Sequence, residues 1–151
     1  MVGKHCHIRE VVIGKNFGGN TNDFTMLFAM MPILTSVQVG ENFAPCKTSV
    51  NNFFGMFGGV ESLVSVDFSG LSEGGHYDFS YLFAGNMGRP FSTLKLPNRK
   101  IFVDGAAYAF AQCTSLQSLD FSNCVFTGSQ DQYECMLMCT YNLDTIIVGD
   151  S

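Results

Sequence analysis

A short apolar pattern returns along this chain at nearly even intervals, and it constrains the fold more than any other feature. The pattern reads apolar-x-x-apolar-x-apolar, and its first two copies, residues 8–17 and 34–43, align at an offset of 26 positions. The central positions of successive copies are separated by 26, 29, 28, 25 and 27 residues. Such even spacing indicates one structural unit that stacks copy upon copy. The six central residues are Val11, Val37, Val66, Leu94, Leu119 and Ile146.

A second periodic element lies between these predicted strands. It pairs two aromatic or apolar residues four positions apart, which places both side chains on one face of a helical turn. Each segment has room for only about two turns, so we expect short α- or 3₁₀-helices there. The pairs are Phe24/Phe28, Phe53/Phe57, Phe79/Phe83, Ala106/Phe110 and Tyr133/Leu137.

The two elements together predict an α/β repeat fold. One strand and one helical turn cannot bury their own apolar side chains, whereas stacked copies share a continuous core. We therefore expect a solenoid of about six parallel strands, with the short helical segments on the opposite side. The length of 151 residues suffices for one core and not for two ordinary ones, so residues 1–151 form a single solenoid domain in this interpretation.

The repeat resembles a known family. Its six copies are similar to the leucine-rich-repeat core L-x-x-L-x-L-x-x-[N/C]; Asn16, Asn42 and Cys124 occupy the last position, and Leu71, Arg99 and Ser151 depart from it. The segment AFAQCTSLQSLDFSN, residues 109–123, looks like the unit M-F-x-x-C-x-S-L-x-x-L-D-L-S-N of BspA-type leucine-rich repeats. That family occurs in surface proteins of bacteria and some protists. The resemblance implies a cell-surface or secreted protein that acts in adhesion or binds a host extracellular protein.

The charge balance excludes other classes of partner. Eight Lys and Arg against 13 Asp and Glu give a formal net charge of −5, which argues against nucleic acid or an anionic membrane surface. No apolar stretch approaches the roughly 20 residues of a membrane span. Residues 1–7 hold no apolar signal core. We expect a protein partner and no membrane insertion.

Residue types that carry chemistry are not grouped in a catalytic or metal-binding pattern. Cys113 and Cys139 recur near the same turn of successive repeats, which favours structural thiols. Cys135 and Cys139 form a C-x-x-x-C pair, but no second pair of ligands follows at metal spacing. We therefore expect no enzyme activity, no cofactor and no metal. An enzyme remains an alternative only if a site lies in the longest insertions, residues 43–49 and 85–90.

The outward-facing residues of the strands form the candidate binding surface, which we call the strand ladder face. Stacked parallel strands place equivalent side chains about 4.8 Å apart, so they form straight lines. One line mixes charges, and the other is rich in hydroxyls that suit a sugar or a peptide strand; the same hydroxyls equally suit a merely solvated sheet. The candidate ligand-binding residues are Gln38, Asp67, Lys95 and Asp120 in the first line and Ser36, Ser65, Thr93 and Ser118 in the second.

The first and last predicted strands are apolar on both faces. Val12 and Ile147 continue the first ladder line but are aliphatic. Solenoids normally protect their terminal repeats with polar caps, because an open end exposes core and an unpaired strand edge. That the chain is a piece of a longer array is the more economical explanation of these two apolar terminal strands. The alternative function is a structural unit that self-associates end to end through Val12 and Ile147.

Overall fold

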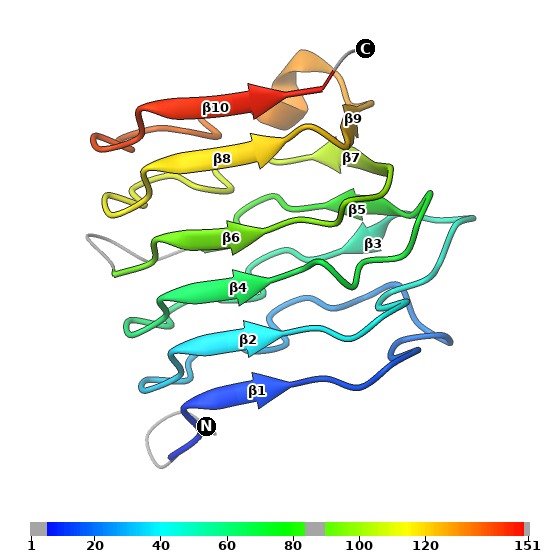
Figure 1. Cartoon of the computed structure of the whole chain (residues 1–151), viewed down its shortest axis with the longest axis horizontal. Helices are drawn as coiled ribbons and strands as arrows, with labels where there is room; N and C mark the ends of the chain where they lie inside the picture. The colour runs from blue at the N-terminus through cyan, green and yellow to red at the C-terminus, as the bar shows by residue number, and fades with distance from the viewer. Residues whose placement is uncertain (1–5, 84–89, 150–151) are drawn as a thin grey trace.

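A computed structural model describes residues 6–83 and 90–149 and shows a parallel β-solenoid of about 5 turns (Figure 1). The first face stacks six strands, all parallel to their neighbours. They are β1 (Glu10–Val12), β2 (Ser36–Gln38), β4 (Ser65–Asp67), β6 (Thr93–Lys95), β8 (Ser118–Phe121) and β10 (Thr145–Val148). The second face stacks β3 (Asn51–Asn52), β5 (His76–Asp78), β7 (Ile101–Gly105) and β9 (Cys124–Phe126).

Every predicted strand centre lies in a strand of the first face. Val11 pairs with Val37, Val37 with Val66 and Val66 with Leu94, while Leu119 pairs with Ile146. The count of six strands is too low, however, because the second face adds four more. The coarse prediction of a parallel solenoid is therefore confirmed. The coils of β2, β4, β6 and β8 each carry a second strand that the apolar pattern does not indicate.

The predicted helical segments form stacked turns instead of helices. Among the described residues the only helix is the 3₁₀ helix η2 (Gln130–Tyr133). In the other segments, N–H groups donate to the next coil: Phe24 N–H to the Asn52 carbonyl and Phe28 N–H to the Met56 carbonyl, both at 2.9 Å. An α-helix keeps these bonds inside its own segment. Here they join successive coils.

The Phe pairs point into the core and stack along the solenoid axis. Phe57 is buried and lies between the rings of Phe28 and Phe83, at centroid distances of 5.7 and 5.5 Å. Phe53 is a hub that contacts Phe24, Phe43, Phe68, Tyr77 and Phe79. The aromatic residues thus fill the core without any need for a ligand.

A short motif, Asp-Phe-Ser or a close variant, bends the chain at the ends of strands. The Asp67 carboxylate accepts a hydrogen bond from the Ser69 N–H at 2.8 Å, while Phe68 between them is fully buried. Such an Asx-turn redirects the backbone, and the buried ring anchors the corner. The same bond recurs from Thr25 to Asp23, from Ser80 to Asp78 and from Ser122 to Asp120.

The corner that leads from the first face to the second shortens along the chain. It comprises residues 39–50 in the second coil, 68–75 in the third, 96–100 in the fourth and 122–123 in the fifth. The hydrogen-bonded order of the first face is interrupted between the last two of these coils. β1-β2-β4-β6 form one sheet, and β8-β10 form a separate pair.

Candidate functional site

The strand ladder face forms as predicted on both sides of this interruption. Gln38 lies beside Asp67 and Asp67 beside Lys95 in the first line. Beyond the interruption, Asp120 pairs with Ile147. The hydroxyl line is divided in the same way: Ser36, Ser65 and Thr93 are neighbours on one side, and Ser118 and Thr145 on the other.

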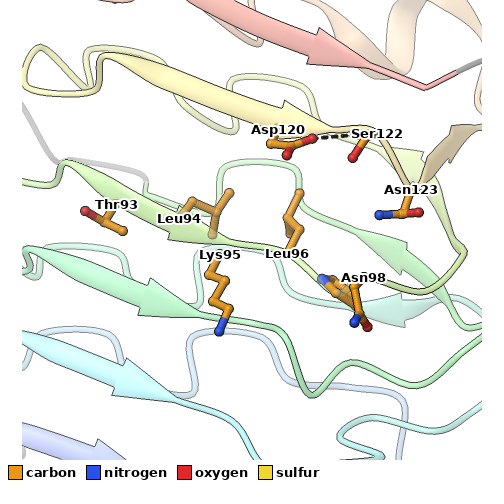
Figure 2. Close-up of a pocket in the computed structure, with 9 residues that line it drawn as sticks. Thr93, Leu94, Lys95, Leu96, Asn98, Asp120, Ser122 and Asn123 are labelled. Atoms are coloured by element: carbon orange, nitrogen blue, oxygen red, sulfur yellow. Dashed lines mark hydrogen bonds between the residues drawn. The ribbon is translucent and has the colours of Figure 1, made fainter.

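Lys95 and Asp120 are not paired neighbours, which corrects the predicted row of alternating charges. The Lys95 ammonium lies 3.9 Å from the Asp67 carboxylate, on the side away from Asp120 (Figure 2). Within residues 6–83 and 90–149, no ion pair joins Lys95 to Asp120. Hydrogen bonding from Ser122 lowers the pKa of the Asp120 carboxyl, and the side chain of Ser122 has a larger effect than its backbone. Asp120 is therefore an anion without a cationic partner in the described chain.

The interruption holds an open hollow of about 360 Å³ (Figure 2). Leu94 and Leu96 line it and are only partly buried. The core residues at the equivalent positions of the neighbouring strands are buried. Their exposed fractions are 1% for Val66, 0% for Phe68, and 2% for both Leu119 and Phe121. The missing strand pairing thus leaves two core leucines partly exposed at the base of the hollow.

Polar side chains from both strands and from the corners that follow them surround these leucines. A concave site with an apolar base and a few convergent polar groups is typical of ligand-binding pockets. Three predicted ladder residues take part, while the other five ladder candidates lie elsewhere on the face. The polar side chains are those of Thr93, Lys95, Asn98, Asp120, Ser122 and Asn123.

The backbone along the hollow lacks the coil-to-coil bonds of the other rungs. On the other rungs, an N–H beyond the strand donates to the neighbouring strand's carbonyl. These bonds run from Ile13 to Gln38 at 2.9 Å, from Val39 to Asp67 at 3.0 Å and from Phe68 to Lys95 at 2.7 Å. In the described part of the chain, no such bond joins Leu96 to Asp120. The hollow is therefore bordered by strand edges with unused backbone donors and acceptors, which the apolar pattern alone did not reveal.

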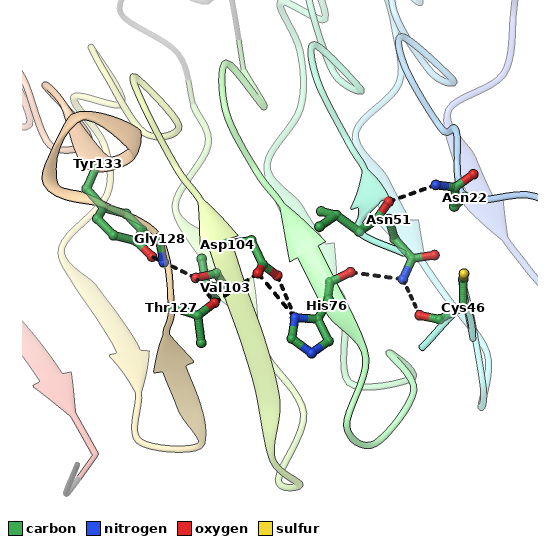
Figure 3. Close-up of polar contacts among 10 residues, drawn as sticks. Asn22, Cys46, Asn51, His76, Val103, Asp104, Thr127, Gly128 and Tyr133 are labelled. Atoms are coloured by element: carbon green, nitrogen blue, oxygen red, sulfur yellow. Dashed lines mark hydrogen bonds and ion pairs between the residues drawn. The ribbon is translucent and has the colours of Figure 1, made fainter. Parts of the chain in front are cut away.

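A separate polar network ties the coils together on the second face (Figure 3). His76 Nδ1 lies 2.9 Å from Asp104 Oδ2, and the Thr127 hydroxyl donates to Asp104 Oδ1 at 3.0 Å. The His76 ring stacks on Phe102 at 4.6 Å. The buried Asn51 amide donates to the His76 carbonyl of the next coil. Each contact links successive coils, so this network holds the solenoid together.

The structure describes only part of the two insertions considered for an enzyme. Of residues 85–90, all but Pro90 lie outside the described residues. In the other insertion, Cys46 lines a second hollow of about 360 Å³ with Thr21 and Asn22. Hydrogen bonding from Thr48 lowers the pKa of the Cys46 thiol. Among the described residues, neither a His nor a carboxylate is among its hydrogen-bond partners.

The six cysteines are free thiols. Burial raises the pKa of Cys124 to about 12, so this thiol stays protonated at neutral pH. No group of three or more His, Cys, Asp and Glu that would hold a metal occurs in residues 6–83 and 90–149.

At the two ends of the solenoid, the side chains of the predicted self-association residues are exposed to solvent. The exposed fractions are 65% for Val12 and 48% for Ile147.

Comparison of the chain with protein-family models, with curated proteins and with solved structures found no match. A search of the described residues found no helix with the length and apolar character that crossing a membrane requires. The class that the fold defines is a parallel β-solenoid, and the feature that distinguishes this chain is the hollow in its first face.

Proposed function

We propose that this chain is a non-catalytic protein-interaction module that binds its partner through the strand ladder face. The observation that carries the proposal is the register of the parallel strands. It fixes Ser36, Ser65 and Thr93 in one line and Gln38, Asp67 and Lys95 in the next, on a backbone that is hydrogen-bonded from β2 to β4 and from β4 to β6. Rigid elements that present polar groups in fixed positions lose little entropy on binding.

The family resemblance supports a place for this module on a cell surface or in a secreted, adhesin-like protein. Asn16 and Asn42, which occupy the Asn position of the leucine-rich-repeat pattern, stack so that the Asn42 amide donates to the Asn16 side-chain oxygen at 2.8 Å. The segment 109–123, similar to the BspA-type unit, supplies part of the same face. In this proposal the partner is a host extracellular protein.

Selection from a displayed library of random dodecapeptides tests the proposal. The bait is the full chain, and the control bait replaces four ladder residues by alanine. All four side chains are exposed, so each change should alter the free energy of unfolding by no more than about 0.5 kcal/mol. We expect enriched peptides that bind the control at least tenfold more weakly. The four substitutions are Gln38→Ala, Thr93→Ala, Lys95→Ala and Ser118→Ala.

Two results would contradict the proposal. One is the absence of any enriched peptide, and the other is enrichment that is equal on the two baits. Thermal unfolding of both baits confirms that a loss of binding does not come from a loss of structure.

The second candidate function is that of an assembly unit whose ends stack on other copies or other repeats. It is favoured by β10, because all four of its residues are exposed, including Ile146, Ile147 and Val148. An uncovered, apolar strand is a ready template for pairing with another chain. Light scattering over a concentration series under reducing conditions tests this function. We expect oligomers that Val12→Glu or Ile147→Glu disperses; a monomer at all concentrations contradicts it.

A further inference from the structure

We propose that the hollow between β6 and β8 binds an extended peptide segment of the partner, which inserts one aliphatic side chain between the two strands. This inference rests on the proposed function and names the ligand and the place on the strand ladder face where it binds. Three observations carry it: the unpaired strand edges, the two uncovered leucines and the charges at the rim.

The unpaired edges suit a peptide backbone. An extended peptide offers alternating N–H and C=O groups at the spacing of a strand, and unused edge groups of a sheet bind such a ligand through main-chain hydrogen bonds. The Leu96 N–H has no coil-to-coil partner among the described residues, whereas the Phe68 N–H one rung earlier is bonded to Lys95. β6 has three residues, so the edge is about 10 Å long and contacts about three peptide residues.

The hollow is too narrow to admit a complete strand. Insertion of one would separate β6 from β8 by about 9.6 Å, twice the spacing of paired strands. Some Cα atoms of β6 lie within 8 Å of Cα atoms of β8. The peptide therefore does not complete a strand between them. Its backbone lies at the mouth of the hollow and bonds only the edge groups that are open there, and one side chain descends between the strands.

The base of the hollow selects an aliphatic side chain. Leu94 and Leu96 are partly exposed there, while their equivalents on neighbouring strands are buried. Covering these leucines with another aliphatic group removes apolar surface from water, which is favourable, whereas a charged side chain at the same place loses its hydration.

The rim selects charges on either side of that aliphatic group. Asp120 carries an unpaired negative charge, and the exposed ammonium of Lys95 stands on the other strand. In an extended peptide, residues i, i+2 and i+4 point to the same side. A basic residue in the first of these positions faces Asp120, and an aliphatic residue in the second covers the leucines. An acidic residue in the third attracts the long, exposed Lys95 side chain of the other strand.

The probe is therefore acetyl-Lys-Thr-Leu-Thr-Glu-amide, titrated into the ¹⁵N-labelled full chain and followed by amide chemical shifts. We expect saturable shifts centred on the amides of Leu94, Leu96, Asp120 and Ser122. Replacement of the central leucine of the peptide by aspartate should weaken binding at least tenfold. N-methylation of that leucine, which removes a backbone donor, should weaken it as well.

The chain offers a matched pair of variants. Asp23 and Asp120 are both exposed and both accept the N–H two residues later, but only Asp120 lies on the ladder face and lines the hollow. Asparagine keeps an oxygen for that bond and removes the charge. We expect Asp120→Asn to weaken the peptide about threefold to tenfold, and Asp23→Asn to leave its affinity unchanged within about twofold.

Several outcomes would overturn the inference. They are an absence of saturable shifts at millimolar peptide, equal weakening by the two asparagine variants, and shifts of these amides by methyl glucoside with none by the peptide. If the library selection still yields peptides that need the ladder residues, only the placement in the hollow is wrong. If neither experiment shows binding, the proposed function fails with it.

Discussion

The fourth and fifth coils are joined on one face and separated on the other. On the second face, β7 pairs with β9 in register, from Ile101 opposite Cys124 to Val103 opposite Phe126. On the first face of the same coils, β6 and β8 are not hydrogen-bonded to each other. The opening is therefore a local wedge-shaped gap in the first face, and the pairing of β7 with β9 holds the two coils together on the second face.

The corner lengths give a physical reason for the wedge. The fourth coil has five residues, 96–100, between its two strands, and the fifth has two, 122–123. The short fifth corner draws the end of β8 toward β9, while the longer fourth corner leaves β6 stacked on β4. A difference of three residues does not act alone, because the corners 68–75 and 96–100 also differ by three residues while β4 and β6 stay paired. The feature particular to the fifth coil is a corner of only two residues.

Truncation of equivalent leucines on the two sides of the hollow is the sharpest test of this comparison. Leu119→Ala removes a side chain that is 2% exposed and should cost about 2–5 kcal/mol in the free energy of unfolding. Leu94→Ala removes a partly exposed side chain and should cost about half as much. Urea unfolding of the two variants measures the difference. Equal losses would show that the two strands are closed together in solution.

Tyr77 reports on the tightly packed coils. Its hydroxyl accepts from the Ser72 N–H at 2.9 Å and lies 3.2 Å from the Ala44 carbonyl, so Tyr77→Phe should cost about 1–3 kcal/mol. Burial raises the pKa of Tyr77 above its ordinary value of 10.0. The unfolded chain therefore releases this proton first, and stability falls as pH rises above about 10.

Urea unfolding of the wild type and of Tyr77→Phe at several pH values between neutrality and pH 11 measures this effect. The stability gap between the two should narrow above about pH 10, because the phenylalanine variant has no phenol to titrate. A gap that stays constant over this range would show that Tyr77 is not protected in the folded chain.

Hydrogen exchange compares the open rung with a closed one at the level of single amides. The Phe68 N–H is bonded to the Lys95 carbonyl at 2.7 Å, and the equivalent Leu96 N–H has no such bond in the described chain. Leu96 should exchange at least about tenfold faster than Phe68, because it needs no opening of the ladder. Saturation with the pentapeptide should slow Leu96 and leave Phe68 unchanged. Equal exchange rates in the free protein would contradict an open rung.

The smallest effects concern the ladder charges beside the hollow. Lys95→Ala should change the free energy of unfolding by less than about 0.5 kcal/mol, because its 3.9 Å contact with Asp67 is exposed to solvent. Asp67→Ala should cost about 1 kcal/mol, since it also removes the bond from the Ser69 N–H. Thermal unfolding distinguishes the two. A larger loss for Lys95→Ala would mean that the ion pair stabilises the rung more than the Asx-turn does.

Much of the first face was predictable because inward-facing residues of stacked strands must recur at the repeat length. The positions of Val37 and Val66 therefore set the register of Ser36, Gln38, Ser65 and Asp67 without any structure. The apolar pattern does not indicate the second face, because the strands there lie between its copies and begin with residues as different as Asn51, His76 and Ile101. The recurring Asp-Phe-Ser or Asn-Phe-Phe that follows a strand was a signal that would have indicated additional corners.

The helical prediction failed for a different reason. A spacing of four residues, as in Phe24 and Phe28, puts two side chains on one side of an α-helix. It does the same in a turn whose residues Met26 and Met30 take positive φ angles of 54° and 59°. Only the neighbouring coil distinguishes the two, because it offers carbonyls that accept the N–H groups a helix would keep for itself.

The sequence by itself determined that this chain is a parallel solenoid with polar ladders on one face, because the period and polarity of the repeat leave few other ways to bury its apolar residues. The tertiary structure alone decided where that face opens. The apolar pattern continues through Leu94 and Leu119 without change, and the separation of their strands depends on how corners of unequal length fit together in space. Thr93, Lys95 and Asp120 therefore were predictable as exposed residues, and their arrangement around a hollow was not.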